Sequence, residues 1–481
     1  MNELEKQLHY PMGDALPANG STLEVAPGIL RLQLPIEFTG LGHVNTYALE
    51  DRDGFALVDP GLPGEKSWRI LESRMAAAGI ENIRMMPTEG HPVVYGDWLH
   101  APGKPTILIY GHFDVQPAEP FDLWQTPPFA PQVRDGKVWG RGASDDKGGM
   151  LIPILSVEAM LKTSGRLPVN VKFFFEGQEE IGSPHLPPFI AANGALLKAD
   201  MIFSADGSQW GEDQPNLITG LKGLVAAEIT VTGAKGDQHS GQQGGGIANP
   251  IHGLSHLIAS MKGLDGKITV DGFYDDVVDL TVEDRAAIAR VPFDEAAYIA
   301  ELGVPEVFGE VGYSTRERLW ARPTFELNGI WGGWQGNGIK TVLPAQAFAK
   351  ITCRLVANQK PDAIFALLKA HIETHCPPGL RVSVERLAGS ADPFLVPPGH
   401  NSSAAAGEVL AEVYGKAPYI TRTGGSIPVM TMLLNELGIH ATVFAFGMND
   451  ENLHAPNEFF RLSNFRTGQT AYAKLLERLG R

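Results

Sequence analysis

The chain has 481 residues, of which 43% are hydrophobic and 20% charged, as in a globular protein large enough for two domains. Its formal net charge of −16 argues against a nucleic-acid partner, because phosphate binding needs a basic surface. No apolar run approaches a membrane span and the first residues lack the features of a secretory signal, so we expect a cytoplasmic protein without a membrane partner.

From about residue 80 the chain alternates apolar, strand-like runs with helix-like stretches, which predicts a doubly wound α/β domain on a mostly parallel sheet. Residues 106–114, 171–180 and 201–207 each contain a run of β-branched or aromatic residues followed by an acidic residue or a histidine. Residues 151–162 have helical spacing, and Pro153 is expected to kink this helix or to lie in its first turn.

The pattern changes near residue 221 and indicates an inserted domain. Half-exposed strands are expected there at residues 223–233, 345–355 and 380–387, and helices at residues 250–261 and 361–375. Two helices on a small antiparallel sheet predict an α+β, ferredoxin-like insert at residues 221–390. The catalytic domain is then split in sequence, with residues 67–220 on one side of the insert and residues 391–481 on the other.

Acidic residues and histidines follow the apolar runs of the predicted catalytic domain. In open α/β sheets, ligands bind beyond the carboxyl ends of the strands, so such side chains should meet at one edge. The candidate metal ligands are His112, Asp145, Glu180, Asp206 and His454. We expect Asp145 to bridge two divalent ions, with His112 and Asp206 on one ion and Glu180 and His454 on the other.

Two further carboxylates near these residues are assigned different roles. Asp114 lies two residues after His112, so on an extended backbone both side chains point the same way, and Asp114 can orient the imidazole. Of the neighbours Glu179 and Glu180, one can bind metal while the other acts as general base. We assign the general base to Glu179.

The kinds of residue present restrict the choice of metal. Cys353 and Cys376 are the only cysteines, which favours reduced thiols and leaves His, Asp and Glu as ligands. Zinc is expected, with manganese and cobalt as alternatives. Two histidine pairs at i, i+4 spacing are interpreted as surface or packing residues, because neither is part of a His-Glu-x-x-His segment. These pairs are His252 with His256 and His371 with His375.

At these residues the chain resembles the di-zinc metallopeptidase family that includes carnosinases, cytosolic nonspecific dipeptidase, aminoacylase-1, acetylornithine deacetylase and carboxypeptidase G. The matching segments are residues 110–117, 139–148 and 175–182. The resemblance implies the ligands and base assigned above and a cis peptide bond between Asp145 and Asp146. It also implies that the insert is a lid domain through which the protein forms a homodimer.

The same resemblance implies functions for residues of the lid and of one loop. His239 lies in a segment similar to the one whose histidine crosses to the partner subunit and stabilises the oxyanion. Asn328 and Arg354 resemble residues that hold the C-terminal carboxylate of the substrate, which the planar guanidinium of Arg suits. Gly425 and Ser426 belong to a segment similar to another loop that contacts substrate.

Residues 1–66 depart from this family and resemble the first hairpin of a metallo-β-lactamase domain. The His-x-His-x-Asp-His motif that binds metal in that fold is absent from the chain. We therefore expect an atypical N-terminal β-hairpin segment without metal chemistry. It is either a fused fragment or a variant cap on the catalytic sheet.

Together these features predict a cytoplasmic, homodimeric exopeptidase that uses two metal ions to hydrolyse dipeptides or short peptides with a free C-terminal carboxylate. The alternative is an N-acyl amino acid amidohydrolase with the same two-metal mechanism. An inactive metal-binding scaffold is a third hypothesis, against which the presence of Glu179 speaks. A β-lactamase-like hydrolase is disfavoured because its histidine motif is missing.

Overall fold

The computed structural model describes residues 75–425 and 427–481, residues 72–73, and the backbone of four strands nearer the N-terminus. These strands pair antiparallel in chain order and are β1 (Thr22–Ala26), β2 (Ile29–Phe38), β3 (Leu41–Asp51) and β4 (Gly54–Val58). The predicted hairpin is therefore part of a larger meander. The rest of residues 1–66 lies outside the described residues, and the resemblance to a metallo-β-lactamase hairpin stays a prediction.

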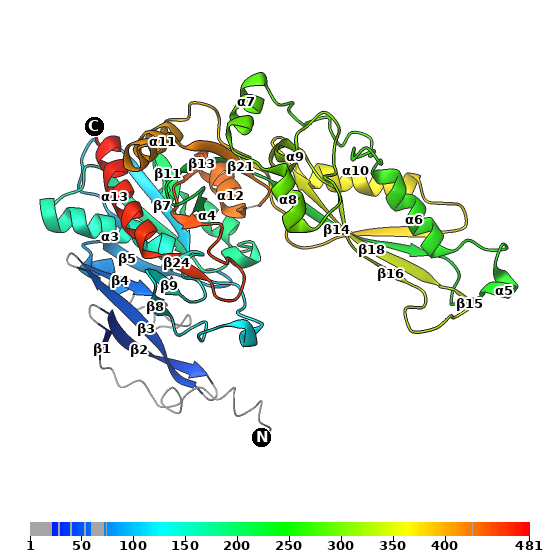
Figure 1. Ribbon diagram of the computed structural model, residues 1–481, viewed down its shortest axis with the longest axis horizontal. Coiled ribbons are helices and arrows are strands. Elements are labelled where there is room, and N and C mark those ends of the chain that lie inside the picture. The colour runs from blue at the N-terminus through cyan, green and yellow to red at the C-terminus, as the bar shows by residue number, and fades with distance from the viewer. Residues whose placement is uncertain are drawn as a thin grey trace. The chain divides into compact units, whose positions relative to one another are not determined.

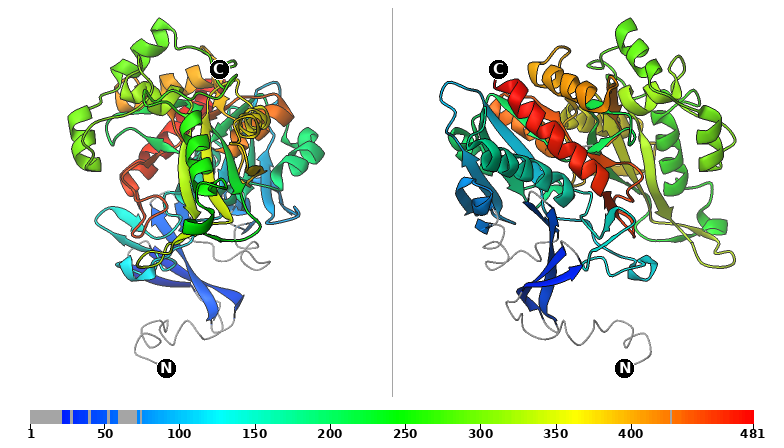
Figure 2. Two further views of the ribbon diagram at one scale, coloured as in Figure 1. Left: turned by 90° about the vertical axis from the view of Figure 1, so that its right-hand side faces the viewer. Right: turned by 60° about the vertical axis from the view of Figure 1, so that its left-hand side comes forward.

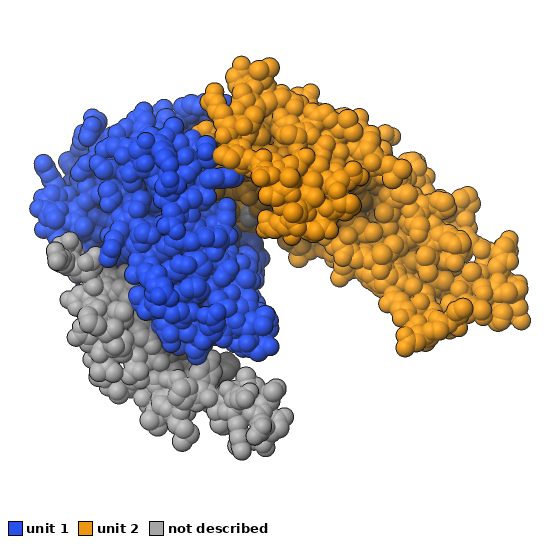
Figure 3. Space-filling model, viewed as in Figure 1, with its two compact units in different colours: residues 1–217, 396–419, 432–481 blue, residues 218–395, 420–431 orange. Residues whose placement is uncertain are grey.

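The chain divides into two compact units, coloured separately in Figure 3. Unit 1 comprises residues 1–217, 396–419 and 432–481, and unit 2 comprises residues 218–395 and 420–431. Residues 420–431 were predicted to belong to the catalytic domain, whereas they fall in unit 2. The first part of this segment belongs to β21 (Tyr419–Thr423), which lies in one sheet with β13 (Asn216–Leu221) and β20 (Phe394–Leu395).

Unit 1 is built on a mixed six-stranded sheet with the order β22-β11-β7-β10-β6-β5. Figure 1 labels β5, β7 and β11 of this sheet. The strands are β5 (Glu81–Met86), β6 (Val93–Trp98), β7 (Thr106–His112), β10 (Asn170–Glu176), β11 (Met201–Ser204) and β22 (Ala441–Val443). The four strands from β22 to β10 are parallel, and β6 and β5 add antiparallel partners at one edge. The predicted doubly wound, mostly parallel sheet is confirmed.

Both faces of this sheet are covered, which explains the continuous apolar runs of its central strands. Phe173 and Phe175 of β10 point into the core formed with α3, α11 and α13, while Phe174 stacks on Phe189 of α4 at 6.1 Å. α3 and α13 lie side by side on their face of the sheet (Figure 2). The helices are α3 (Lys147–Ser164), α4 (Leu186–Leu197), α11 (Asn401–Tyr414), α12 (Pro428–Leu437) and α13 (Leu462–Leu479).

Helix α3 begins earlier than the sequence pattern predicts, directly after Asp146, and Pro153 lies in its interior rather than in its first turn. The proline removes one helical N–H donor. The helix nevertheless continues, because apolar side chains on both sides of the proline, including Met150 and Ile154, are buried in the core of unit 1. Its N-terminal end is thereby held against the sheet edge that carries the candidate ligands.

Unit 2 is built on an antiparallel sheet with the order β16-β18-β14-β19. Along the chain, the four strands and the two helices that cover them follow in the order β14 (Gly223–Thr232), α6 (Pro250–Met261), β16 (Glu326–Gly332), β18 (Gln346–Leu355), α10 (Pro361–Thr374) and β19 (Arg381–Arg386). This order of strands and helices is the ferredoxin-like arrangement. Buried residues alternate along β18 because α6 and α10 cover one face, so the predicted α+β insert is confirmed.

Shorter elements complete the described part of the chain. In unit 1 they are η1 (Phe121–Leu123), β8 (Gln132–Arg134), β9 (Lys137–Trp139), η2 (Glu179–Ile181), β12 (Ser208–Gln209), β23 (Gly447–Met448) and β24 (Phe459–Arg461). In unit 2 they are β15 (Gln238–His239), α5 (Ser240–Gln243), α7 (Val282–Arg290), α8 (Glu295–Leu302), α9 (Thr315–Ala321) and β17 (Val342–Leu343). Within the described residues, every helix is too short or too polar to cross a membrane.

Candidate dinuclear metal centre

Three parallel strands deliver polar side chains to one edge of the unit 1 sheet. His112 is the last residue of β7 and is paired in register with Glu176, the last residue of β10. Glu180 follows in the 3-10 turn after β10, and Asp206 follows the end of β11. Because these strands are parallel neighbours, their carboxyl ends bring the three side chains into one region.

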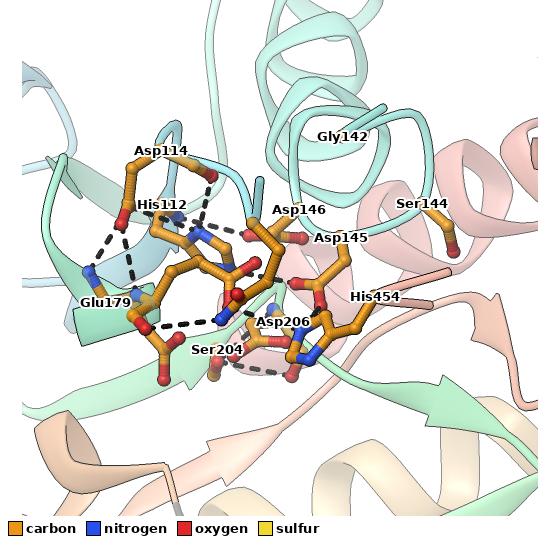
Figure 4. A network of polar contacts seen from close by, with 12 residues as sticks. His112, Asp114, Gly142, Ser144, Asp145, Asp146, Glu179, Ser204, Asp206 and His454 are labelled. Carbon is orange, nitrogen blue, oxygen red and sulfur yellow. Dashed lines mark hydrogen bonds and ion pairs between the residues drawn. The ribbon is translucent and has the colours of Figure 1, made fainter. Parts of the chain in front are cut away.

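Asp145 lies at the centre of the cluster, between two histidines (Figure 4). One of its carboxylate oxygens, Oδ1, is 3.0 Å from Nε2 of His112, and the other, Oδ2, is 2.9 Å from Nε2 of His454. The same His454 nitrogen is 3.1 Å from Oε2 of Glu180. Each oxygen of one carboxylate therefore faces a different imidazole.

The side chains form two groups with the composition of a metal site. One group contains His112, Asp145 and Asp206, and the other contains Asp145, Glu180 and His454, with the potential ligand atoms of each group within 4.8 Å of one another. A Zn²⁺ ion binds such atoms at about 2.0–2.2 Å, which separates two tetrahedral ligands by about 3.3–3.5 Å. The contacts around Asp145 are close to that spacing, so these residues fit two ions that share Asp145.

The charges of the cluster show why it would bind cations. Burial and the neighbouring carboxylate of Asp145 raise the pKa of Asp206 to about 7. Hydrogen bonds with Asp145 and Glu180 raise the pKa of His454 to about 10. Although burial opposes the shift, the two imidazoles lower the pKa of Asp145 below its usual range. Divalent ions would supply the positive charge that protons supply to this cluster.

Asp114 holds the turn that carries the two glutamates. Its carboxylate accepts hydrogen bonds from the backbone N–H groups of Glu179, at 3.2 Å, and Glu180, at 3.0 Å. Oδ1 of Asp114 also lies 3.4 Å from Nδ1 of His112 (Figure 4). The backbone oxygen of Asp114 is 3.2 Å from the same nitrogen. Asp114 thus orients one candidate ligand and links it to the turn that presents another.

The two glutamates of this turn lie in different surroundings. Glu180 accepts a hydrogen bond of 2.9 Å from Nε2 of Gln116, a residue without a role in the sequence analysis, and faces His454. Burial and the carboxylate of Asp206 raise the pKa of Glu179 to about 9. Glu179 therefore lies beside the candidate ligands as a carboxyl group that can exchange a proton with a reacting molecule.

The peptide bond between Asp145 and Asp146 is cis, as the family resemblance implied. Asp146 is fully buried, and its carboxylate accepts a hydrogen bond of 3.2 Å from the backbone N–H of His112. A Cβ atom at Gly149 would lie only 2.1 Å from this carboxylate, so the glycine in the first turn of α3 leaves the space that Asp146 occupies. The backbone on both sides of the candidate bridging ligand is therefore tightly packed.

Glu458, four residues after His454, was not predicted to have a role. Glu458 is fully buried, and its carboxylate is 2.8 Å from Nη1 of Arg141. The signal available in the sequence was an acidic residue a few positions after a candidate ligand. That signal does not reveal a partner more than three hundred residues away.

The predicted residues outside this cluster belong to unit 2. His239 is exposed at the end of β15, where its Nδ1 accepts a hydrogen bond of 3.1 Å from the N–H of Gly241, so that Nε2 carries the proton of the neutral ring. Arg354 lies on β18, on the sheet face opposite the helices, and the exposed Asn328 lies at a bulge in β16.

The loop after β21 carries the remaining predicted contacts. The carbonyl oxygen of Gly425 accepts a hydrogen bond of 3.1 Å from the backbone N–H of Lys222, and its own N–H donates to Oγ1 of Thr423 at 3.2 Å. Ser426 lies outside the described residues. The roles of His239, Asn328, Arg354, Gly425 and Ser426 stay predictions.

A doubly wound unit with this cluster at its sheet edge, together with a ferredoxin-like unit, is the architecture of a two-domain metallohydrolase. A family model described as peptidase family M20/M25/M40 matches residues 108–478, and the chain belongs to that family. This confirms the metallopeptidase resemblance found in the sequence.

Named relatives agree with this assignment. The chain is similar to the Cys-Gly metallodipeptidase dug1 of Schizosaccharomyces pombe, with 33% identity over 384 residues that cover 78% of this chain and 80% of the relative. The Beta-Ala-His dipeptidase of Homo sapiens is 30% identical over 388 residues, covering 79% and 76% of the two chains. The crystal structure of the M20 family metallo-carboxypeptidase Sso-CP2 from Sulfolobus solfataricus matches with a TM-score of 0.76 and 31% identity, over 86% of this chain and 94% of that chain.

Proposed function

We propose that the protein is a dinuclear metal-dependent exopeptidase that hydrolyses dipeptides or short peptides with a free C-terminal carboxylate. The observation that carries this proposal is the arrangement of Asp145, whose two oxygens each face a different histidine within two groups of potential ligands. The printed names of the relatives, a Cys-Gly metallodipeptidase and a Beta-Ala-His dipeptidase, support a dipeptide substrate.

His112, Asp145 and Asp206 would hold one ion, and Asp145, Glu180 and His454 the other. When bound, two such ions polarise a carbonyl oxygen and lower the pKa of water in the site. Zinc is the proposed metal, with manganese and cobalt as alternatives, because the ligand atoms are imidazole nitrogens and carboxylate oxygens.

The chain's own residues would carry the protons and hold the substrate. Glu179 would take a proton from the attacking water and return it to the nitrogen of the leaving amino acid. Arg354 and Asn328 would bind the C-terminal carboxylate, and Gly425 and Ser426 would also contact the substrate. The Nε2–H of His239 would donate to the developing oxyanion.

We also propose that the protein forms a homodimer through unit 2. β16 is an edge strand of the unit 2 sheet, and exposed apolar side chains lie on it and just after it, including Ile330 and Trp334. An exposed apolar edge strand is suited to pair with a second chain. The free thiols of Cys353 and Cys376 fit the predicted cytoplasmic location.

The test is a substrate panel that pairs each dipeptide with its N-acetyl analogue, run with zinc, manganese and cobalt. Turnover of the free dipeptides, abolished by chelation and restored by metal, is the expected result. Turnover of acylated substrates alone would instead identify an N-acyl amino acid amidohydrolase. Hydrolysis that is insensitive to chelation would refute the two-metal mechanism.

A further inference from the structure

The carboxylate of Glu458 lies fully buried among four hydrogen-bond donors. Its Oε1 accepts the backbone N–H groups of Ser144, at 2.9 Å, and Asp145, at 3.0 Å. Its Oε2 accepts the N–H of Gly142, at 2.9 Å, and Nη1 of Arg141, at 2.8 Å. All four donors belong to one short segment that ends at the candidate bridging ligand, and its backbone N–H groups converge on the anion as in a nest.

Glu458 lies where two segments leave the same pair of strands. β24 pairs with β9, with Phe459 opposite Trp139, and the backbone oxygen of Glu458 accepts the N–H of Gly140 at 2.9 Å. From β9 the chain runs forward to Asp145. From β24 it runs backward to His454. The side chain of Glu458 therefore joins the segment of one candidate ligand to that of the other.

The segment on the His454 side has an unfavourable backbone that requires anchoring. Three residues in it that are not glycine have positive φ angles, namely Asn452 at 55°, His454 at 57° and Asn457 at 61°. Such conformations are uncommon for L-residues and persist only where surrounding contacts hold them. The four bonds of Glu458 supply such contacts at the end of this segment, immediately before β24.

We infer that Glu458 is a positioning residue that fixes the separation between Asp145 and His454 and, through them, the binding of the second metal ion. This inference rests on the proposed function, because it requires that Asp145 and His454 bind metal. The physical reason is that a carboxylate can accept all four hydrogen bonds. The positive charge of Arg141 offsets the cost of burying the negative charge of Glu458. An amide at this position would turn a donor toward N–H groups, and the segment of Asp145 would shift.

Glu451 provides a matched control within the same part of the chain. It is also fully buried, and its carboxylate accepts hydrogen bonds from Oγ of Ser144, at 2.6 Å, and the N–H of Met448, at 2.9 Å. It also contacts Arg461 at 3.2 Å. It also accepts the backbone N–H of Arg461 at 3.1 Å, and in the described part of the chain the backbone of Asp145 donates to Glu458 and not to Glu451. Glu451→Gln therefore removes a buried negative charge without removing the link to the bridging ligand.

The experiment titrates zinc and cobalt into the metal-free forms of the full-length wild type, Glu458→Gln and Glu451→Gln. Isothermal calorimetry gives the number and affinity of the ions, and the visible spectrum of the cobalt form reports ligand geometry. Circular dichroism reports folding. For Glu458→Gln we expect one ion to bind about 10–100-fold more weakly, the usual effect of removing a group that orients a ligand. The cobalt spectrum should change and kcat should fall with little change in KM.

The outcomes distinguish a failure of this inference from a failure of the proposed function. Binding of both ions with wild-type affinity and spectrum by Glu458→Gln would overturn the inference, as would an equal loss of affinity in Glu451→Gln. If Glu458→Gln does not fold, Glu458→Asp decides by the same criteria, because it keeps the charge opposite Arg141 but is one methylene too short to reach all four donors. Failure of the wild type to bind two ions would instead refute the proposed function.

Discussion

Nε2 of His454 lies 2.9 Å from Oδ2 of Asp145, although 309 positions separate the two residues in the chain. The whole of unit 2 lies between them in the sequence, together with residues 146–217, 396–419 and 432–453 of unit 1. The candidate centre therefore exists only when the two halves of unit 1 have come together.

His454→Ala should remove one of two bound ions and reduce kcat/KM by a factor of about 100 or more, because a ligand of the second ion is lost. Metal content measured by atomic emission, together with steady-state kinetics, checks this expectation. His252→Ala in α6 is the control, since that histidine is interpreted as an ordinary helix residue. Two ions retained in His454→Ala would show that this residue is not a ligand.

Glu179→Gln should lower kcat by about 10²–10⁴-fold while both ions and KM are retained, because the variant removes a proton acceptor and no ligand. Glu180→Gln should instead lower the metal content, since its carboxylate faces His454. Kinetics and metal analysis of the two neighbouring variants distinguish their roles. A nearly unchanged kcat in Glu179→Gln would remove this residue from the mechanism.

Homodimerisation should depend on the edge strand of unit 2. Ile330→Lys places a charge among the exposed apolar residues of β16 and is expected to shift the protein toward the monomer. Sedimentation velocity over a range of protein concentrations measures the shift. Leu123→Lys, at an exposed apolar position of unit 1, should leave the oligomeric state unchanged. A monomeric wild type would exclude the proposed dimer.

If His239 acts on the active site of a partner chain, two inactive variants should complement each other. Mixing His239→Ala with Glu179→Gln forms heterodimers in which one site has both an intact base and an intact histidine. We expect the mixture to recover up to about a quarter of wild-type activity, by random pairing and the usual contribution of an oxyanion donor. No recovery after verified subunit exchange would mean that His239 does not act across the interface.

Lys222 should make stability depend on pH. The side chain is 3% exposed, its Nζ donates to the backbone oxygen of Arg318 at 3.0 Å, and burial together with Arg354 lowers its pKa from 10.5 to about 7. Below pH 7 the folded and unfolded states both carry the proton, so the full cost of burying the charge is present. Between pH 7 and 10.5 the unfolded chain binds more protons than the folded chain, and the free energy of unfolding rises with pH.

Lys222→Met removes this contribution. The free energy of unfolding of the variant, relative to the wild type, should therefore be highest below pH 7 and should fall by on the order of 1 kcal/mol per pH unit between pH 7 and 10.5. Urea unfolding followed by tryptophan fluorescence at several pH values measures the difference. Lys350→Met, at a half-exposed lysine of the unit 2 sheet, is the control for removal of a lysine charge. A difference that does not change with pH would contradict the prediction.

Local patterns predicted much of the fold. The apolar runs of β7, β10 and β11 indicated buried parallel strands, and the alternation along β18 indicated a sheet covered on one face. Both follow from side-chain periodicity, which depends on neighbours in the chain. Local patterns did not predict that Pro153 lies in the interior of α3, or that residues 420–431, whose first part pairs as β21, belong to unit 2.

For the candidate site, the sequence by itself determined which side chains follow the carboxyl ends of the strands, and hence that acidic residues and histidines gather at one edge. The sequence also predicted Asp145 as the bridge between the groups of His112 and His454. Only the tertiary structure decided which of its oxygens faces which imidazole, and that Glu458 joins the segments of Asp145 and His454. The physical reason is that a buried carboxylate bonds to the donors that lie near it in space, wherever they stand in the sequence. Residues hundreds of positions apart become neighbours only when the core of unit 1 has packed.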